Sequence, residues 1–312
     1  MAVAVLNADL RSLCEEGLPD WLEARWFSSS AQLLELAPSA EIGWFDGPDI
    51  TATYDAVRRA SGLVWLNTIA AGIDPFPLAL LRERQIVLTN GAGLNAPAIA
   101  EYAVMAMLTL AKGYREVVRA QDRHQWLGDS PGKAELCGAK ALIIGSGGIG
   151  VRLGDLLRAF GVTVTDVRRR GSAEALGPEE WRERLGEFDW VIVNVPATAQ
   201  TRGMISRSEL AAMKSTAFIL NFARGTVLDQ SALIQALRER HIAGAFLDVT
   251  DPEPLPPDNP LWSLANCHIS MHLSGRSQTT LYRRGIDRFL RNLERYERGE
   301  PLEAAVNLDL GY

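Results

Sequence analysis

The sequence predicts an α/β protein with two domains, each built on a parallel β-sheet that helices cover. The chain has 312 residues, which is more than one hydrophobic core usually serves. From residue 139 onward, short apolar runs rich in β-branched residues alternate with segments whose apolar residues recur every three or four positions. Residues 1–95 show a weaker form of the same alternation. Strands that are apolar on both faces and alternate with helices form parallel sheets with helices on both sides.

In the first part of the chain, four apolar runs are predicted to be strands and two amphipathic segments to be helices. The expected strands are AVAVLNA (2–8), EIGWFD (41–46), LVWLNTI (63–69) and QIVLTN (85–90), and the expected helices are ITATYDAVRRAS (50–61) and DPFPLALLRER (74–84). The next segment, residues 95–114, predicts a long apolar helix with Asn95 as its cap and Pro97 in its first turn. A helix this apolar needs burial by a domain or by a second subunit.

In the second part, the pattern predicts a larger domain of the same kind. The expected strands are residues 139–145, 162–167, 190–195, 217–222 and 243–249, and the expected helices are 145–160, 206–214 and 229–240. A charged amphipathic helix is expected at 277–298.

Composition and charge exclude several classes of partner. With 47% hydrophobic and 22% charged residues and a net charge of −6, the chain reads as a soluble globular protein. This charge gives no reason to expect binding to nucleic acid or to an anionic membrane. The longest apolar run is too short to span a bilayer, and the start lacks a leader pattern, so a cytoplasmic location is expected. The three cysteines have no CxxC spacing, which favours free thiols over disulfides or a metal site.

A glycine-rich turn is the first candidate for a binding site. LIIGSGGIG places Gly145, Gly147 and Gly150 in GxGxxG spacing between an expected strand and an expected helix. The first glycine permits a tight turn, the second lets backbone approach a pyrophosphate, and the third lets helix and strand pack closely. The start of the helix offers N–H groups to the phosphates. The predicted cofactor-binding turn comprises Gly145, Ser146, Gly147, Gly148, Ile149 and Gly150.

Several ordered segments resemble those of the D-isomer-specific 2-hydroxyacid dehydrogenases, a family that includes glyoxylate/hydroxypyruvate reductases and phosphoglycerate dehydrogenases. The similar segments are NTIAAGID (67–74), TNGAGLNAPAIAEYAV (89–104), VPATAQTRGMIS (195–206), LNFARGTVLD (220–229), AGAFLDVTDPEPLPPDNPLW (243–262) and HISMHLSG (268–275). The first is similar to the family's substrate loop, the second to its first interdomain crossing, and the last three to its catalytic segments. Motifs that recur in order at family spacing are more specific than any single one.

The resemblance implies two Rossmann-like or flavodoxin-like α/β domains with a cleft between them. It implies a discontinuous substrate domain at 1–95 plus 284–312 and a dinucleotide-binding domain at 96–283. Family members are usually dimers through the nucleotide domain and its long crossing helix. A homodimer is therefore expected, although burial of that helix within a monomer is the alternative.

Three residues carry the chemistry that the resemblance implies. Arg224, in FARG, has a guanidinium fork that can bind a carboxylate. His272 is implied as the proton donor, because an imidazole exchanges protons near neutral pH. Glu253, in DPEPLP, is implied as its partner, since a neighbouring carboxylate stabilises and orients the protonated ring. Many relatives have Thr-Pro-His where this chain has Ser270-Met271-His272, which puts the family's geometry at this turn in question.

The resemblance also implies contacts to substrate and nicotinamide. Ala71 and Gly72 would bind the substrate carboxylate through backbone N–H groups, alongside Arg224. Asp248 would orient the nicotinamide carboxamide. The path of the nicotinamide would be lined by Val195, Pro196, Phe222 and Ala223. The implied reaction transfers hydride from the cofactor to the keto carbon of a small 2-oxoacid, while His272 delivers a proton to the oxygen.

The stretch VTVTDVRRR (162–170) bears on the choice between NADP and NAD. Asp166 lies 21 residues beyond Gly145 and could accept from a ribose hydroxyl, as in NAD-type folds. Aligned with the family pattern, however, Arg168 stands where NAD-specific members have aspartate. Arg168, Arg169 and Arg170 offer charge-assisted hydrogen bonds to a 2′-phosphate. NADP is therefore the expected cofactor, with NAD as the alternative.

Other functions stay open at this point. An NAD-dependent dehydrogenase of another 2-hydroxyacid is one, and a nucleotide-sensing protein like the corepressors of this superfamily is another. A formate dehydrogenase is disfavoured, because that branch pairs its histidine with glutamine, whereas this chain has Glu253. Trp44 and Trp65 could line a substrate pocket, although an aromatic residue in a strand more often belongs to the core.

Overall fold

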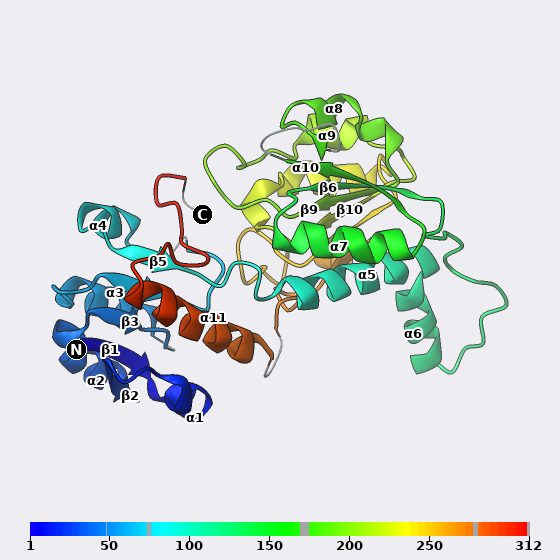
Figure 1. Ribbon diagram of the computed structural model, residues 1–312. Coiled ribbons are helices and arrows are strands. Elements are labelled where there is room, and N and C mark those ends of the chain that lie inside the picture. Colours follow the sequence, from blue (N-terminus) through cyan, green and yellow to red (C-terminus); the bar gives the residue numbers. More distant parts are fainter. Residues whose placement is uncertain (48, 74–75, 169–174, 277–279, 311–312) are drawn as a thin grey trace. The chain divides into compact units, whose positions relative to one another are not determined.

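The computed structural model describes residues 1–312 apart from 48, 74–75, 169–174, 277–279 and 311–312 (Figure 1). The chain forms two compact units. One comprises Met1–Leu94 with Ser277–Tyr312 and is called the discontinuous unit; the other, Asn95–Arg276, is called the continuous unit. Each contains a sheet whose strand pairs are all parallel, which confirms the predicted class. The assignment of the discontinuous unit to substrate binding and of the continuous unit to cofactor binding remains a prediction.

The discontinuous unit has a five-stranded sheet in the order β2-β1-β3-β4-β5, the strand order of flavodoxin-like folds. Its strands are β1 (Ala2–Asn7), β2 (Leu22–Phe27), β3 (Ile42–Trp44), β4 (Trp65–Asn67) and β5 (Val87–Thr89). Its helices are α1 (Arg11–Cys14), α2 (Ser30–Leu36), α3 (Ile50–Arg59), α4 (Leu78–Glu83) and α11 (Thr280–Glu297).

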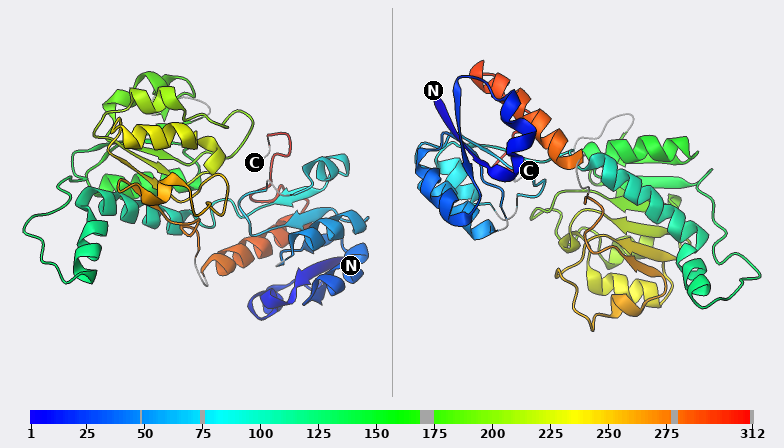
Figure 2. Two further views of the ribbon diagram at one scale, coloured as in Figure 1. Left: turned by 180° about the vertical axis from the view of Figure 1, so that it is seen from behind. Right: turned by 90° about the horizontal axis from the view of Figure 1, so that it is seen from below.

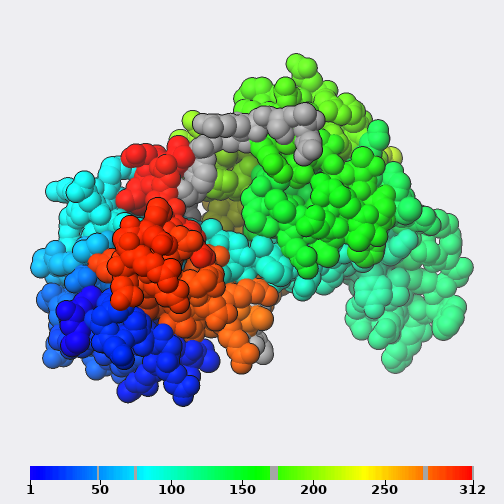
Figure 3. Space-filling view, in the orientation of Figure 1, coloured from blue at the N-terminus to red at the C-terminus, as the bar shows by residue number. Residues whose placement is uncertain are grey.

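Helices cover both faces of this sheet. Apolar residues of α2, α3 and α4 form one core cluster with the sheet, and those of α1 and α11 form the other (Figure 2). Trp44 and Trp65 are 1% and 0% exposed, and their rings lie 5.0 and 5.1 Å from the ring of Phe289 on α11. These two tryptophans are core residues. In the space-filling view, α11 lies on the N-terminal segment of its own unit (Figure 3).

The continuous unit has a seven-stranded sheet in the order β12-β11-β10-β9-β6-β7-β8. Its strands are β6 (Lys140–Ile144), β7 (Thr163–Val167), β8 (Ala175–Leu176), β9 (Trp190–Val193), β10 (Phe218–Asn221), β11 (Gly244–Leu247) and β12 (Cys267–Ile269). Its helices are α5 (Ala96–Lys112), α6 (Tyr114–Asp122), α7 (Gly148–Ala159), α8 (Glu180–Glu183), α9 (Arg207–Ala212) and α10 (Gln230–Arg238). The chain winds outward in both directions from β6, so the order reverses between β6 and β9. Ligands bind at such a reversal, beyond the carboxyl ends of the strands.

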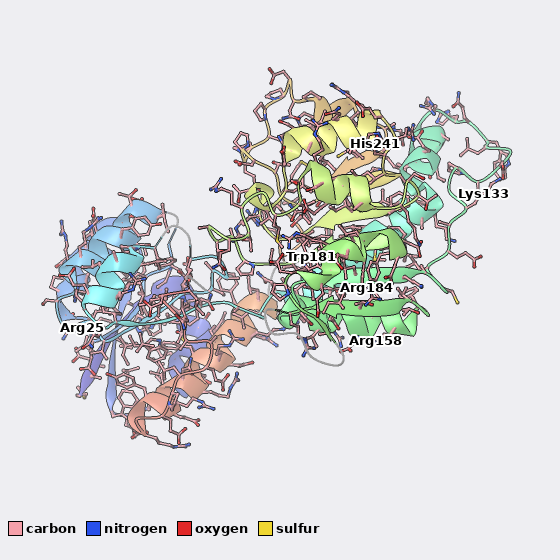
Figure 4. The ribbon with its side chains drawn as sticks, turned by 90° about the horizontal axis from the view of Figure 1, so that it is seen from above. Arg25, Lys133, Arg158, Trp181, Arg184 and His241 are labelled. Atoms are coloured by element: carbon pink, nitrogen blue, oxygen red, sulfur yellow. The ribbon has the colours of Figure 1, made fainter. Side chains whose placement is uncertain are left out.

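Alternate residues of β6 point to opposite faces of the larger sheet. Ala141 and Ile143 pack with α5 and α7, whereas Leu142 and Ile144 pack with α8, α9 and α10. Trp181 of α8 is fully buried in the second of these layers (Figure 4). This arrangement buries the sheet on both faces and presents the strand ends as the accessible edge.

The long apolar helix forms as predicted, but its cap does not. Pro97 lies in the first turn of α5, and Gly113 ends the helix with φ of 59°. Asn95 occupies the cap position with φ −89° and ψ −1°, and its side chain makes no capping hydrogen bond. A cap residue needs an extended backbone for its side chain to reach the first turn, so the prediction for Asn95 is wrong. Among the described helices, none is long and apolar enough to cross a membrane.

Candidate active site

The glycine turn follows β6 and leads directly into α7. Gly145 has φ of 104°, and a Cβ there would lie 2.7 Å from the backbone C and O of Asn194. A Cβ on Gly150 would lie 2.3 Å from the carbonyl oxygen of Gly145 and 3.1 Å from Ile143. Both positions therefore require glycine, one for its dihedral angle and both for space.

The second glycine of the motif differs, because a Cβ on Gly147 would have nothing within 4 Å. Gly147 is the cap of α7, and the first N–H groups of the helix lack intrahelical partners. Beside this turn, the side-chain nitrogen and oxygen of Asn194 are buried and have no hydrogen-bond partner among the described residues. An open approach, a helix N-terminus and an orphaned buried amide fit a bound dinucleotide.

At the end of β7, one acid points inward and one arginine is exposed. Asp166 is 8% exposed and accepts hydrogen bonds from Ser146 Oγ (3.0 Å) and Arg158 Nη2 (3.3 Å). Arg158 belongs to α7 (Figure 4). Arg168 follows β7 immediately and is exposed. Arg169 and Arg170 lie outside the described residues.

The segment after β10 carries Arg224. Its Nη1 donates to the carbonyl of Ala223 (2.9 Å), and its own carbonyl accepts from Asn221 Nδ2 (3.1 Å). The side chain is half-buried. The next residue, Gly225, lies against a second loop, since a Cβ there would be 2.0 Å from the backbone of Thr250. The Arg224 segment and the loop after β11 are therefore packed in direct contact.

Glu253 and His272 form a pair within the continuous unit. The Nδ1 atom of His272 lies 2.8 Å from Glu253 Oε2, and the two side chains are 46% and 38% exposed. The other oxygen, Oε1, accepts from the backbone N–H of Thr250 at 3.1 Å. The carboxylate is thus held at one oxygen and directs the other to the imidazole, which leaves Nε2 as the ring atom for exchange with a ligand.

Asp248, at the end of β11, is buried beneath the turn that carries His272. It is 3% exposed, and its carboxylate accepts from Ser270 Oγ (2.7 Å), from Ser274 N–H (3.1 Å) and from Ser274 Oγ (2.5 Å). Its backbone carbonyl accepts from the N–H of His272 at 2.6 Å. The sequence did not predict these partners.

The four residues predicted to line the nicotinamide path follow β9 and β10. Phe222 and Ala223 are 6% and 5% exposed and contribute to the two cores of the unit. Val195 is half-buried and Pro196 is exposed. The side chains of Phe222 and Ala223 pack inside the unit, so a ligand beside these two residues would contact their backbone atoms.

In the discontinuous unit, the loop after β4 is anchored on Asp46. The Asp46 carboxylate accepts from Trp44 Nε1 (2.8 Å), Thr68 Oγ1 (2.7 Å) and the N–H of Ile69 (2.6 Å). Burial raises the pKa of Asp46, and these three hydrogen bonds act in the opposite direction. The acid therefore fixes the start of the predicted substrate loop.

The same loop continues through Ala71 and Gly72. The carbonyl of Ala71 accepts from Asn90 Nδ2 at 2.8 Å, which fixes the peptide from its carbonyl side. Within the described part of the chain, the N–H groups of Ala71 and Gly72 make no hydrogen bond. Fixed backbone N–H groups of this kind can bind an anion.

Sequence reasoning missed Asn194, Ser274 and Asp46. The first two fall inside the quoted segments VPATAQTRGMIS and HISMHLSG or directly beside them, but polar residues at strand ends are too common to single out. Asp46 is the last residue of the expected strand 41–46. A position in the fold, rather than residue type, identifies each of them.

A parallel sheet with a glycine turn at its reversal point defines a dinucleotide-binding α/β protein. Residues 104–274 match the family described as D-isomer specific 2-hydroxyacid dehydrogenase, NAD binding domain. The chain belongs to this family. In the described residues, no cluster of His, Cys, Asp and Glu could hold a metal ion.

Known relatives are similar over most of the chain. It is 32% identical to a glyoxylate reductase of Thermofilum pendens over 268 residues, covering 82% of this chain and 78% of that one. It is 33% identical to the glyoxylate reductase/hydroxypyruvate reductase of Mus musculus, covering 69% and 68%. Among solved structures, a D-isomer specific 2-hydroxyacid dehydrogenase from Xanthobacter autotrophicus Py2 in complex with NADPH and MES is similar with a TM-score of 0.82 and 25% identity, covering 100% and 99%.

Proposed function

We propose that the protein reduces a small 2-oxoacid of the glyoxylate or hydroxypyruvate type to the D-2-hydroxyacid, with NADPH as hydride donor. The observation that carries this proposal is the contact of 2.8 Å between His272 Nδ1 and Glu253 Oε2 in a chain of this family. The names of the Thermofilum and mouse relatives support the substrate class. The NADPH bound to the Xanthobacter protein supports the cofactor.

A bound nicotinamide would supply the hydride that reduces the keto carbon. The chain supplies position and charge around it. Arg224 binds the substrate carboxylate with its guanidinium fork, and the N–H groups of Ala71 and Gly72 are further candidates for the same anion. His272 donates the proton from Nε2 to the keto oxygen, while Glu253 holds Nδ1 and stabilises the protonated ring. Asp248 retains one of its roughly four acceptor sites for the carboxamide.

For the cofactor, the glycine turn and the first turn of α7 bind the pyrophosphate. Arg168 binds the 2′-phosphate, and we include Arg169 and Arg170 on the sequence alone, since they lie outside the described residues. The burial of Asp166 and its bonds to Ser146 and Arg158 support this preference, because an acid engaged in that way is a poor acceptor for a ribose hydroxyl.

We also propose a homodimer formed through the continuous unit. In Figure 1, α6 and the segment that follows it extend away from the sheet of their own unit. Large apolar residues are exposed in this part of the chain, namely Tyr114 (56%), Val118 (39%), Trp126 (99%) and Leu127 (41%), and Met105 (46%) is exposed on α5. Sedimentation of the wild type should give twice the chain mass, and W126S/L127S should sediment as the monomer; a monomeric wild type would end this proposal.

The decisive experiment assays wild type and Arg224→Ala against a panel of 2-oxoacids with NADPH and with NADH. Arg224→Ala should lose at least about a hundredfold in kcat/KM, because a bidentate charge-assisted contact to the substrate is removed. NADPH affinity should be unchanged. Arg184→Ala is the matched control, since Arg184 is paired with Glu187 on the surface (Figure 4).

Three outcomes would contradict parts of the proposal. An unaltered rate of Arg224→Ala with every 2-oxoacid removes Arg224 from the site. A kcat/KM with NADH equal to or above that with NADPH overturns the cofactor assignment. Asp166 would then be the residue that accepts a hydrogen bond from the ribose hydroxyl. Binding of both cofactors without turnover of any 2-oxoacid favours the nucleotide-sensing alternative.

A further inference from the structure

The turn that carries His272 has a backbone conformation that few residues adopt. Met271 and His272 have φ of 54° and 59°, two consecutive non-glycine residues in the left-handed region. Side chains with a Cβ disfavour that region, so such residues persist only where their surroundings enforce them. Proline is confined to φ near −65°. Position 271 of this turn is therefore closed to proline, and the observed conformation requires another residue there.

Packing of apolar side chains does not enforce this conformation. Met271 is 61% exposed, Leu273 is 44% exposed, and the His272 side chain is 46% exposed. Hydrogen bonds restrain the turn instead. Ser270 N–H donates to the carbonyl of Leu247 (2.9 Å) and Leu273 N–H to the carbonyl of Ser270 (3.1 Å), and four further bonds go to Asp248. Ser270 and Ser274, on either side of the exposed tripeptide, are 5% and 4% exposed.

Both ends of the turn are bonded to one carboxylate. Asp248 Oδ1 accepts from Ser270 Oγ at 2.7 Å and from Ser274 N–H at 3.1 Å, and Oδ2 accepts from Ser274 Oγ at 2.5 Å. The middle of the turn is bonded to the same residue, through the N–H of His272 and the carbonyl of Asp248 at 2.6 Å. Hydrogen bonds to a charged acceptor are stronger than neutral ones, and burial strengthens them further.

We infer that Ser270 and Ser274, acting through the buried carboxylate of Asp248, are positioning residues that fix the turn carrying His272. They place the imidazole where Glu253 reaches Nδ1, and so aim Nε2. The inference rests on the proposed function for the role of His272. The two hydroxyls therefore supply, in this chain, the rigidity that a proline cannot supply at position 271.

The test compares Ser274→Ala with a matched control, Ser263→Ala. Ser274→Ala keeps the N–H bond to Asp248 and loses only the hydroxyl. Ser263 is an exposed serine of the same unit whose hydroxyl bonds the carbonyl of Pro260. Ser274→Ala should lower kcat about tenfold or more, because a small displacement of a catalytic group is costly. The dissociation constant for NADPH should stay within about twofold of wild type, and Ser263→Ala should match wild type throughout.

A second readout follows the imidazole itself. In protein labelled with ¹³C-histidine, the His272 resonances are identified by their loss in His272→Asn, and they should shift or broaden in Ser274→Ala but not in Ser263→Ala. If Ser274→Ala fails to fold, Ser270→Ala should show both effects and Ser270→Thr, which keeps a hydroxyl, should restore wild-type values. Met271→Pro should also lower kcat.

The outcomes separate this inference from the proposed function. Wild-type kcat in the serine-to-alanine variants overturns the inference, and so does a fall in kcat with unaltered His272 resonances. A wild type that turns over no 2-oxoacid ends the proposed function, and the His272 resonances alone then decide whether the serines hold the turn.

Discussion

Glu253 is the residue whose role depends most directly on a single contact, its bond of 2.8 Å to His272 Nδ1. Glu253→Gln keeps the size of the side chain and removes its charge, so the protonated imidazole is stabilised less. In the proposed reaction this ring donates the proton, so kcat/KM for reduction should fall in Glu253→Gln. The fall should be about fivefold or less, because exposed ion pairs contribute about 0.2–1 kcal/mol.

The measurement is kcat/KM for both proteins under one set of conditions, with Glu239→Gln as control. Glu239 lies 3.5 Å from His241 on the surface, where removing its charge should leave kcat/KM unchanged. A kcat/KM of Glu253→Gln equal to that of wild type would show that the carboxylate does not act on His272.

Single residues could be predicted from the sequence where a motif fixes their type. Arg224, Glu253 and His272 were predicted in this way, and the structure brings Glu253 and His272 together; their roles stay predictions. The contacts of Ser270 and Ser274 could not be predicted, because they depend on left-handed dihedral angles at Met271 and His272. Non-glycine residues seldom adopt such angles, so the residue types at these two positions do not predict the conformation of the turn.

At the scale of elements, the junction of β6 and α7 is set by Gly150. Gly150→Ala would place a Cβ 2.3 Å from the carbonyl oxygen of Gly145, so α7 must move away from the strand. Overpacking of this kind costs about 1–3 kcal/mol of unfolding free energy. The shift also displaces the first turn of the helix, so affinity for the nicotinamide cofactor should fall. Urea unfolding and cofactor titration measure the two effects.

Gly154→Ala provides the control within the same helix. A Cβ there meets only the end of the flexible Arg158 side chain, at 3.0 Å. Alanine favours helix over glycine by about 1 kcal/mol, so this variant should be as stable as wild type or more stable. Equal stability of Gly150→Ala and Gly154→Ala would show that the third glycine of the motif is not needed for packing.

Elements were predictable where their hydrophobic pattern was regular. All five strands expected from residue 139 onward formed; β6, β9, β10 and β11 are buried along nearly their whole length, whereas β7 is buried only at its last two residues. The prediction missed β2 (Leu22–Phe27) and α2 (Ser30–Leu36). β2 lies at an edge and pairs only with β1, so its middle residues are half-buried and include the charged Glu23 and Arg25. An edge strand lacks the continuous apolar run that identifies a central one.

At the scale of the whole molecule, one histidine links stability to pH. His268, on β12, is half-buried near Phe246, and burial together with Arg115 and Arg119 lowers its pKa to about 4. Arg115 is held beside it by a hydrogen bond of 2.9 Å from Nη1 to the carbonyl of Cys267. Protonation of His268 would add a positive charge beside these two arginines in a partly desolvated site, and Glu116 opposes their effect only weakly.

The folded protein therefore binds this proton less readily than the unfolded chain, where a histidine has its ordinary pKa of 6.5 against about 4 when folded. Above pH 6.5 neither state is protonated there, and the full stability is present; as pH falls toward 4, only the unfolded state gains the proton and stability is lost. The free energy of unfolding should therefore fall between pH 7 and 5, by at most about 1.4 kcal/mol per pH unit from this one group.

His268→Gln cannot titrate and should lose less stability over that interval, whereas the exposed control His241→Gln should follow wild type. Urea unfolding at pH 7 and pH 5 measures this difference. An equal loss of unfolding free energy in His268→Gln and wild type would mean that His268 does not link stability to pH.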